Sequence, residues 1–379
     1  MKLLFASSYH YPAHPAQFKH GLVMARSYAA LLGKNFLYLV WYNKDPEVLF
    51  GIAFEELNPR HWRLRKTKFL SLVIFFSLAR FFARSPLWRS TDTVVITQES
   101  KVALLLLFWK IFFRFSLIYE CHGLHSPLTD GLVCRWADAV VFVTQKSREE
   151  ASKRFGNIRK ALYLSNAFDP NDYTLARTHS ISALRRKLGL PEEKKLVGYV
   201  GRYVALGHDK GVETGLRTLA RIADPSVQFC FVGGTPQEIE KFSALAATLG
   251  VEDRTQFVPY QKDSTRVAEY TVAMDILIYT PPPMKFFLEE TSPMKLYEYM
   301  GAQKPIVVSD FPSLREILDS DSAFFVKPEP AAIAEAVMSI FRNPEDAQKR
   351  ASRAFERVRE NTWERRAKKI IELGASCTE

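Results

Sequence analysis

Residues 199–220, YVGRYVALGHDKGVETGLRTLA, read as a buried strand, a loop and a helix. Arg202 follows the strand directly, and Lys210 and Gly211 stand where the helix begins. A strand that leads through a loop into a helix is the repeating unit of parallel sheets with helices on both faces. The segment therefore predicts an α/β fold, provided that the same unit recurs along the chain.

The unit recurs in two series of short apolar runs separated by amphipathic stretches. The first series is KLLFASS, NFLYLVWY, DTVVITQ, FSLIYECH, DAVVFVT and KALYLSN, and the second is LVGYVGR, VQFCFVGG, TQFVPY, DILIYT, PIVVSD and AFFVK. A polar stretch near residues 170–194 separates them. We predict two doubly wound, Rossmann-like domains, residues 1–175 and 176–360, facing each other across a cleft, with ligands beyond the carboxyl ends of the strands. The helical segment within residues 361–379 is predicted to pack back on the N-terminal domain.

The composition suits a globular protein of a reducing compartment. A chain of 379 residues with 47% hydrophobic residues is long enough to bury two cores. Its four cysteines show no C-x-x-C spacing, and the N-terminus has no apolar core followed by a cleavage site. No apolar stretch reaches the roughly 18 to 20 residues of a membrane span. We expect a cytoplasmic protein.

The net charge of +11 is distributed unevenly. Between Glu56 and Asp92 there is no acidic residue, and the apolar run FLSLVIFFSLARFF is surrounded by eight basic ones: Arg60, Arg63, Arg65, Lys66, Lys68, Arg80, Arg84 and Arg89. Two interpretations stay open, an anionic membrane surface contacted through residues 60–89 on the inner face of the cell membrane, or a core helix with solvated basic ends. Nucleic acid is not expected, because no homeodomain, zinc-finger or RNP signature accompanies the charge.

Arg202 and Lys210 are candidate phosphate ligands. Two cations beside the amide groups of a helix N-terminus suit a diphosphate, although each residue taken alone is as typical of an ordinary surface. No G-x-G-x-x-G follows a strand, and no G-x-x-x-x-G-K-[ST] is present. Neither a dinucleotide cofactor nor a Walker P-loop is therefore indicated.

A second candidate motif lies in residues 289–310, EETSPMKLYEYMGAQKPIVVSD, where seven residues separate Glu290 from Glu298. We predict that Ser292 is the N-cap of a helix and that Pro293 lies in its first turn, which leaves the amides of residues 292–296 available to phosphates. Glu298 would then reach ribose hydroxyls and Glu290 the group that the phosphates carry. The alternative is a solvated helix residue and a partner of the helix dipole.

Together these residues resemble the GT-B glycosyltransferases, specifically retaining glycosyltransferase family four, the glycosyl transferases group 1. The matching motifs are YVGR, KGVETGL, FVGG, the E-x7-E pair and TWERRAKKIIEL, with looser matches at YECHG, ADAVVFVTQKSRE and LSNAFD. The resemblance implies that the second domain binds a nucleotide-sugar, UDP- or GDP-linked, and that the first binds a glycan or lipid-linked acceptor. It implies transfer to a hydroxyl with retained anomeric configuration, in cell-surface polysaccharide or glycolipid synthesis.

The resemblance also implies roles for individual residues. The implied catalytic residues are Glu290, His122, Arg202 and Lys210. The implied donor nucleotide site comprises Arg202, Lys210, Val258, Pro259, Tyr260, Ser292, Pro293, Met294, Lys295, Leu296 and Glu298. The implied acceptor or interdomain residues are His20, Gly21 and Asn166. No metal and no cofactor are expected, because the nucleotide-sugar is a co-substrate and the D-x-D spelled by residues 319–321 is interpreted as part of a loop.

Two departures from the family and two other classes of function stay open. The first loop, SSYHYPAHPAQFKHG, lacks the glycine pair of many relatives, and the loop TPPPMKFFLEE is rich in Pro and Phe where relatives often have Glu-Gly-Phe-Gly. A sugar-nucleotide 2-epimerase has the same architecture and would need no acceptor. A non-catalytic, membrane-surface nucleotide-binding protein would use the basic segment alone.

Overall fold

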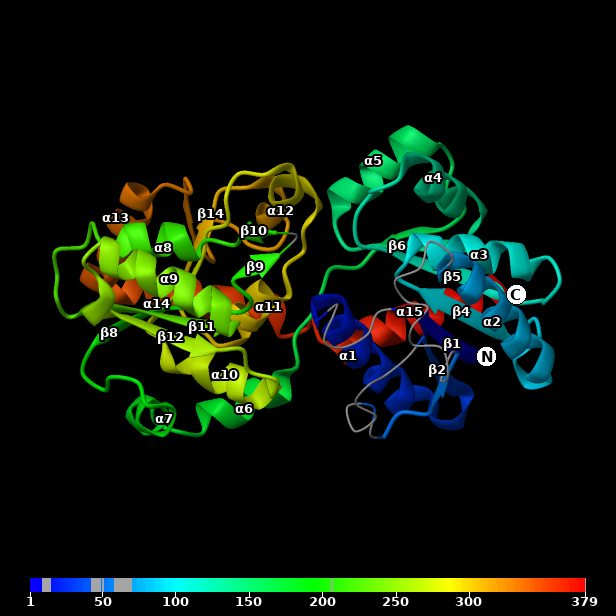
Figure 1. Cartoon of the computed structure of the whole chain (residues 1–379), viewed down its shortest axis with the longest axis horizontal. Coiled ribbons are helices and arrows are strands. Elements are labelled where there is room, and N and C mark those ends of the chain that lie inside the picture. Colours follow the sequence, from blue (N-terminus) through cyan, green and yellow to red (C-terminus); the bar gives the residue numbers. More distant parts are fainter. Residues whose placement is uncertain (9–14, 42–48, 50, 58–69, 206, 379) are drawn as a thin grey trace. The chain divides into compact units, whose positions relative to one another are not determined.

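The computed structural model describes all of the chain except residues 9–14, 42–48, 50, 58–69, 206 and 379. The chain divides into two compact units (Figure 1). Unit 1 consists of Met1–Ser165 together with Trp363–Glu379, and unit 2 consists of Asn166–Thr362. Among the described helices, none has both the length and the apolar character that crossing a bilayer requires.

Unit 1 is built on a parallel sheet of seven strands in the order β3-β2-β1-β4-β5-β6-β7. The strands are β1 (Lys2–Ser7), β2 (Phe36–Val40), β3 (Phe54–Glu56), β4 (Thr93–Thr97), β5 (Ser116–Cys121), β6 (Ala139–Phe142) and β7 (Ala161–Tyr163). The continuous apolar runs of β1, β4 and β5 form strands because both of their faces are covered by helices. The strand order reverses between β1 and β4, where such sheets bind ligands.

Alternate side chains of this sheet point to two different helical layers. Leu4 and Val95 share a core with Leu78 of α2 and Leu106 of α3, whereas their neighbours in sequence point to the opposite face. The first layer is α2 (Leu70–Arg84), α3 (Ser100–Lys110), α4 (Pro127–Trp136) and α5 (Gln145–Phe155), with short turns at η1 (Gly33–Asn35) and η4 (Pro86–Trp88). The second layer is α1 (Pro15–Leu32) and α15 (Trp363–Thr378), drawn in blue and red in Figure 1. The prediction that the C-terminal helix returns to the first domain is confirmed.

Unit 2 contains a parallel sheet of six strands in the order β12-β11-β8-β13-β14-β15. The strands are β8 (Lys195–Val200), β11 (Val227–Gly234), β12 (Thr255–Pro259), β13 (Ile276–Tyr279), β14 (Ile306–Ser309) and β15 (Phe324–Val326). A small antiparallel hairpin, β9 (Val204–Ala205) with β10 (His208–Asp209), follows β8. The order reverses between β8 and β13, so the carboxyl ends of these two strands mark the expected binding edge.

Helices cover both faces of the second sheet, as the prediction of two Rossmann-like domains requires. They are α6 (Pro170–Arg177), α7 (Ile181–Leu188), α8 (Val212–Leu219), α9 (Pro236–Thr248), α10 (Ser264–Ala273), α11 (Met294–Gly301), α12 (Pro312–Arg315), α13 (Pro330–Arg342) and α14 (Pro344–Val358), with short turns η5 (Glu252–Arg254) and η6 (Phe286–Glu290). Helices α8 and α11 begin at the carboxyl edge of the sheet. They therefore determine which side chains reach the switch point.

Candidate functional site

Arg202 and Lys210 lie at the carboxyl end of β8. The hairpin β9–β10 turns the chain back, so that the amide of Lys210 donates to the carbonyl oxygen of Tyr203 at 2.8 Å. Gly211 has a φ of +110°, and a Cβ there would lie 2.6 Å from the carbonyl oxygen of Thr280, which follows β13. Only glycine permits this close approach, which places the two cations of the predicted site at the switch point.

The charges of these two residues are not compensated within the described part of the chain, where neither side chain forms an ion pair. Burial, together with the neighbouring charge of Arg202, lowers the pKa of Lys210 to about 8. Removal from water and a like charge both disfavour the protonated amine. Protonation of Lys210 is therefore less favourable in the folded protein than in water, and a bound anion would favour it.

The amides at the start of α8 are not available to a phosphate, contrary to the prediction. The carboxylate of Asp209 accepts from the amides of Gly211 at 3.1 Å, Val212 at 3.0 Å and Glu213 at 3.2 Å. An acidic side chain that caps a helix satisfies the same donors that an anionic ligand would use. At this part of the site, the side chains of Arg202 and Lys210 are therefore the groups available to a diphosphate, and the amides of α8 are not.

Helix α11 begins one residue later than expected. Pro293 is the N-cap and no side chain caps this end, whereas the hydroxyl of Ser292 lies 3.0 Å from that of Tyr297. The prediction of Ser292 as the N-cap is therefore wrong. The amide of Leu296 donates to the carbonyl oxygen of Pro293 at 3.0 Å, so the amides of Met294 and Lys295 are the ones left at the uncapped start.

Lys295 was predicted as a donor-site residue through its backbone amide, but the sequence did not predict that its side chain is buried in the site. It is only 6% exposed, and its Nζ has no hydrogen-bond partner in the described part of the chain. The ammonium lies 3.6 Å from the ring centroid of Tyr199, beneath Gly201, where an added Cβ would come within 2.9 Å of Nζ. Burial, and secondly the charge of Lys210, hold the pKa of Lys295 well below its usual range. A buried amine without a counter-ion indicates a missing anionic partner.

The hydroxyl of Tyr299 fixes α11 against β8. It accepts from the amide of Val200 at 2.8 Å and donates to the carbonyl oxygen of the same residue at 3.1 Å. Lys295 lies one turn before Tyr299 on the helix, so this contact sets the depth at which its ammonium is buried. Arg202, Lys210 and Lys295 are thereby gathered at one edge of one sheet.

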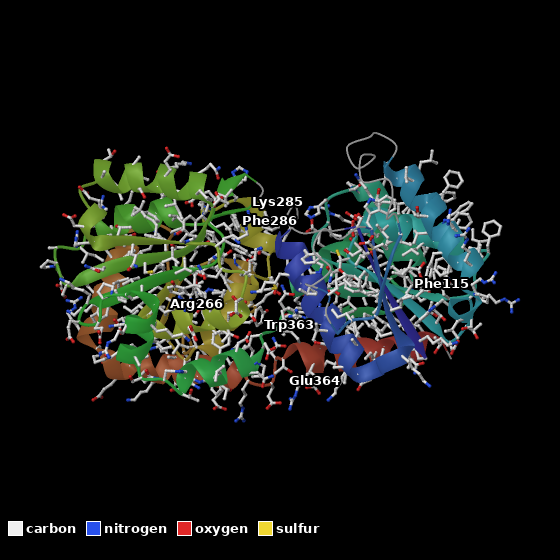
Figure 2. All side chains as sticks on the ribbon, turned by 60° about the horizontal axis from the view of Figure 1, so that its bottom comes forward. Phe115, Arg266, Lys285, Phe286, Trp363 and Glu364 are labelled. Atoms are coloured by element: carbon white, nitrogen blue, oxygen red, sulfur yellow. The ribbon has the colours of Figure 1, made fainter. Side chains whose placement is uncertain are left out.

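The two glutamates of the E-x7-E motif flank the start of α11. Glu290 is the last residue of η6, has a side chain 12% exposed, and lies 4.0 Å from Nζ of Lys285, which Figure 2 labels beside Phe286. Glu298 is half-buried on α11, three residues after Lys295, and its charge partly offsets the loss of protonation there. The structure places both acids in unit 2 with the three cations.

The remaining predicted residues of unit 2 lie near this edge. Val258 and Pro259 end β12, and the amide of Tyr260 donates to the carbonyl oxygen of Gly234 at the end of β11. Asn166 begins unit 2 and donates through Nδ2 to the carbonyl oxygen of Ser292 at 2.5 Å. Asn166 thus supports the loop that leads into α11.

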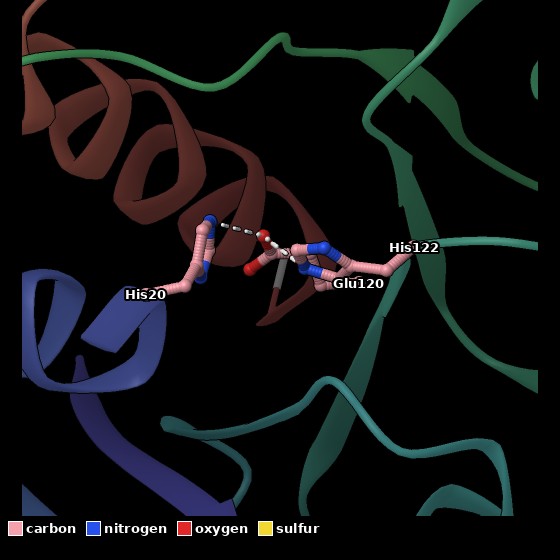
Figure 3. A group of neighbouring side chains, drawn as sticks. All are labelled: His20, Glu120 and His122. Carbon is pink, nitrogen blue, oxygen red and sulfur yellow. Dashed lines mark hydrogen bonds and ion pairs between the residues drawn. The ribbon is translucent and has the colours of Figure 1, made fainter. Parts of the chain in front are cut away.

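In unit 1 the predicted residues His20 and His122 meet at a residue that was not predicted, Glu120 (Figure 3). His122 follows β5 and its Nε2 lies 3.0 Å from Oε1 of Glu120, while Nε2 of His20 on α1 lies 3.4 Å from the same oxygen. Gln98 donates to Nδ1 of His20 at 2.6 Å, which leaves the imidazole proton on the nitrogen facing Glu120. Gly21 follows His20 on α1, and a Cβ there would lie 3.2 Å from the hydroxyl of Tyr38.

Arg366 of α15 completes this cluster. Its Nη2 lies 2.8 Å from Oε1 of Glu120, and both side chains are 1% exposed. Burial opposes ionisation of Glu120, but Arg366 and the two histidines outweigh it and hold the pKa of the carboxyl well below its usual range. The signal in the sequence was the TWERRAKK motif, whose partner in YECHG is about 250 residues away and not deducible from spacing.

The same cluster also offers a set of ligand atoms for a metal ion. The ligand atoms of His20, Glu120 and His122 lie within 4.8 Å of one another, and imidazole with carboxylate suits zinc and related metals. However, the guanidinium of Arg366 is bonded to the same carboxylate oxygen, and a buried cation there repels a second one. The geometry fits an ion-paired carboxylate that orients His122 better than it fits a metal ligand.

The D-x-D at residues 319–321 is engaged with arginines. Asp319 forms an ion pair with Arg357, and Asp321 lies 3.5 Å from Nη1 of Arg353. The segment follows α12 in a turn and precedes β15. These ion pairs join the loop before β15 to helix α14.

Comparisons with known proteins find related sequences and related folds. The family described as "Glycosyl transferases group 1" matches residues 180–357. A candidate teichuronic acid biosynthesis glycosyltransferase, TuaC of Bacillus subtilis (strain 168), is 25% identical over 53% of this chain and 46% of its own length. The D-inositol 3-phosphate glycosyltransferase of Xylanimonas cellulosilytica is 24% identical over 64% of this chain and 58% of its own length. The chain thus spans about half the length of the curated relatives it matches.

Solved structures resemble the chain over its whole length. Anabaena Alr3699/HepE in complex with UDP has a TM-score of 0.79 at 19% identity, covering 99% of this chain and 100% of that one. A glycosyltransferase from Rickettsia africae has a TM-score of 0.80 at 14% identity, covering 100% and 99%. The fold is that of the GT-B glycosyltransferases. Residues 180–357, which make up most of unit 2, belong to the glycosyl transferases group 1.

The buried pair in unit 1 gives a first prediction. Arg366→Met leaves the carboxylate of Glu120 buried without its cation, so it should lower the free energy of unfolding of unit 1 by about 3–5 kcal/mol. The double variant Glu120→Gln with Arg366→Met should recover at least half of that loss, and the exposed Lys369→Met should change nothing. Urea unfolding measures all three and, in addition, Glu120→Gln alone, so that both single losses can be compared with the double one. Losses that simply add in the double variant would contradict a coupled pair.

The lowered pKa of Lys210 gives a second prediction. Its folded-state pKa of about 8 lies below that of an unfolded lysine, so between about pH 8 and 10 the unfolded chain binds more protons. Stability therefore rises with pH in this window. Between pH 8 and pH 10, the melting temperature of the ligand-free wild type should rise by at least about 2–4 °C more than that of Lys210→Met. This is the shift that about 1 kcal/mol of stability gives a domain of this size. The exposed Lys349→Met is the control, and parallel curves for wild type and Lys210→Met refute the assignment.

Proposed function

We propose that the protein is a retaining glycosyltransferase that moves a sugar from a UDP- or GDP-linked donor to a hydroxyl of a glycan or lipid-linked acceptor. The observation that carries the proposal is the buried ammonium of Lys295, which has no partner in the described part of the chain and lies beside the unpaired cations Arg202 and Lys210. Three basic side chains at a switch point suit the negative charge of a diphosphate. Such a group is present in every UDP-linked and GDP-linked sugar.

Each residue of the site then has a defined task. Arg202, Lys210 and Lys295 stabilise the charge that builds on the departing diphosphate, the step at which preorganised charges lower the barrier most. Glu298 accepts from ribose hydroxyls, and Glu290 from hydroxyls of the donor sugar. Val258 to Tyr260 provide backbone for the base.

In unit 1 the proposal assigns a sugar contact to His122, whose orientation Glu120 fixes. Because Nε2 of His122 faces the Glu120 carboxylate, its proton is donated there and Nδ1 is left as an acceptor. An imidazole nitrogen that accepts a hydrogen bond suits a sugar hydroxyl. His20 and Gly21 would lie with it on the side of the acceptor.

The chemistry we propose needs neither a protein nucleophile nor a metal. The acceptor oxygen attacks the anomeric carbon from the face that the diphosphate leaves, and a phosphate oxygen takes the acceptor proton. The anomeric configuration is thereby retained. Three cations provide the charge that a divalent ion supplies in other transferases.

The names of related proteins support the donor class and suggest the acceptor class. The structures of HepE were solved with UDP and with UDP-glucose, and TuaC is assigned to teichuronic acid biosynthesis. We propose by analogy that this chain acts in cell-surface polysaccharide or glycolipid synthesis, on the cytoplasmic side where nucleotide-sugars are made. Analogy of fold alone would not suffice, so the site must be tested directly.

A panel of nucleotides scored by thermal stabilisation tests the donor site. UDP or GDP at 100 times its Kd should stabilise the wild type by about 2.7 kcal/mol. Lys295→Met should abolish this stabilisation while leaving the ligand-free protein as stable as wild type or more so, because a buried unpaired charge has been removed. Arg202→Ala should lower turnover by about 10²-fold or more.

Lys241→Met, on the exposed surface of α9, is the matched control and should behave as wild type. Undiminished nucleotide stabilisation in Lys295→Met would rule out the diphosphate site. Incubation of a UDP-sugar without acceptor distinguishes a 2-epimerase, which would still convert it.

Removal of divalent ions tests the proposed independence of metal. Because the leaving group is neutralised by side chains, excess EDTA should leave turnover within about twofold. The readout is initial rate before and after addition of zinc, magnesium or manganese. A loss that one of these ions reverses would mean that the His20, Glu120 and His122 cluster, or another group, holds a catalytic metal.

A further inference from the structure

The exposed apolar side chains of the protein are concentrated on one layer of unit 1. In the described part of the chain eleven large hydrophobic side chains are exposed, and only Phe54 and Leu175 lie elsewhere. The other nine lie on α2, η4, α3, the turn after α3, and α4: Leu72, Phe76, Leu87, Phe108, Ile111, Phe112, Leu128, Leu132 and Trp136. Scattered single residues of this kind are ordinary, but a gathering of them marks an interaction surface.

The aromatic side chains of α2 and α3 form a connected surface. Together with the exposed apolar side chains of η4, the turn after α3, and α4 it is here called the α2–α4 face. Helix α2 packs on α3 and α3 on α4, and the three are drawn side by side in Figure 1. The ring of Phe75 lies 5.4 Å from that of Phe76 and 5.1 Å from that of Phe108, which in turn lies 5.5 Å from Phe112. On α4 the exposed residues recur every fourth position, at 128, 132 and 136, and so share one side of that helix.

The core of unit 1 does not need these residues. On α2 the side chains of Ile74, Leu78 and Phe82 are buried against the sheet, while Phe76 is 60% exposed. After α3, Ile111 is 76% exposed. The interpretation of the whole apolar run as core is therefore wrong for Leu72 and Phe76, whereas Phe69 lies outside the described residues.

The charges around the face have one sign. Five arginines on the same elements are exposed and form no ion pair with any described residue: Arg80, Arg84, Arg89, Arg114 and Arg135. The sequence has no acidic residue from 57 to 91, and Asp130 on α4 is buried. An apolar surface rimmed by unpaired arginines complements anionic headgroups over acyl chains.

We propose that the α2–α4 face docks unit 1 on an anionic lipid bilayer. Phe76, Ile111 and Phe112 enter the boundary between headgroups and acyl chains, Trp136 lies at headgroup depth, and the arginines bind lipid phosphates. A bilayer accounts for the unpaired arginines better than a second copy of the chain, whose identical face would oppose them with like charges. The proposal is independent of the donor site and of turnover.

Co-sedimentation with vesicles tests the proposal on the full-length protein. Wild type should pellet with phosphatidylglycerol vesicles and remain in the supernatant with phosphatidylcholine vesicles at 0.1 M salt. Binding should weaken at 1 M salt, because the screening length falls from about 10 Å to about 3 Å. Arg80→Gln with Arg84→Gln and Arg114→Gln should weaken binding by about 100-fold, because each basic group near an anionic surface contributes roughly a factor of five.

The apolar part is tested by Phe76→Ser with Ile111→Ser and Phe112→Ser, a variant that changes only exposed side chains and should keep the melting temperature and nucleotide stabilisation of wild type. It should lose vesicle binding at every salt concentration. The matched control changes exposed residues of unit 2, Leu175→Ser with Arg221→Gln, and should bind as wild type does.

Three results would overturn the proposal. Wild type that stays in the supernatant with phosphatidylglycerol vesicles at low salt does not bind lipid. Equal binding by the apolar variant and the control places the contact elsewhere. Dimers seen by light scattering that the apolar variant abolishes, without vesicle binding, show that the face joins copies of this chain instead.

Discussion

The burial of Lys295 without a counter-ion is the constraint on which the organisation of unit 2 depends. For its ammonium to lie beneath the end of β8, residue 201 must lack a side chain, and Tyr199 must present the face of its ring. Helix α11 must also be held at a fixed depth, which the hydroxyl of Tyr299 achieves through Val200. Residues that serve no catalytic step are thus specified by the need to keep one charge in place until an anion arrives.

Unit 1 solves a similar electrostatic problem in the opposite way. There the buried charge is the carboxylate of Glu120, and the chain supplies its own cation, Arg366, from a helix that follows unit 2 in the sequence. A buried ion pair within the chain fixes the orientation of its members, whereas a buried amine without a counter-ion leaves a place for an anionic ligand. The same chain therefore combines an ion-paired carboxylate that orients His122 with a buried amine that has no hydrogen-bond partner among the described residues.

The sequence predicted the elements whose signal is local. Continuous apolar runs gave both parallel sheets, and the strand-loop-helix pattern placed Arg202 and Lys210 at the correct edge. It failed in two different ways. The capping of α8 by Asp209 is a local contact that the pattern did not identify, whereas the partner of Arg366, Glu120, lies 246 residues away in the sequence. Lys295 did carry a local signal, because a lysine in the first turn of a helix is unfavourable next to the positive end of the helix dipole. The burial of its side chain could be seen only in the three-dimensional structure.

The return of α15 to unit 1 has a consequence for how the protein is made. A ribosome releases Met1–Ser165 first and unit 2 next, yet the helix that covers one face of the first sheet is synthesised last. Until Arg366 emerges, Glu120 has no cation and the apolar residues beneath α15 stay uncovered. Unit 2, whose residues are contiguous, can complete its core during translation, whereas unit 1 must wait for the end of the chain. Unit 1 can therefore be completed only after unit 2 has been synthesised, and a product that ends before Trp363 lacks one helix of that unit.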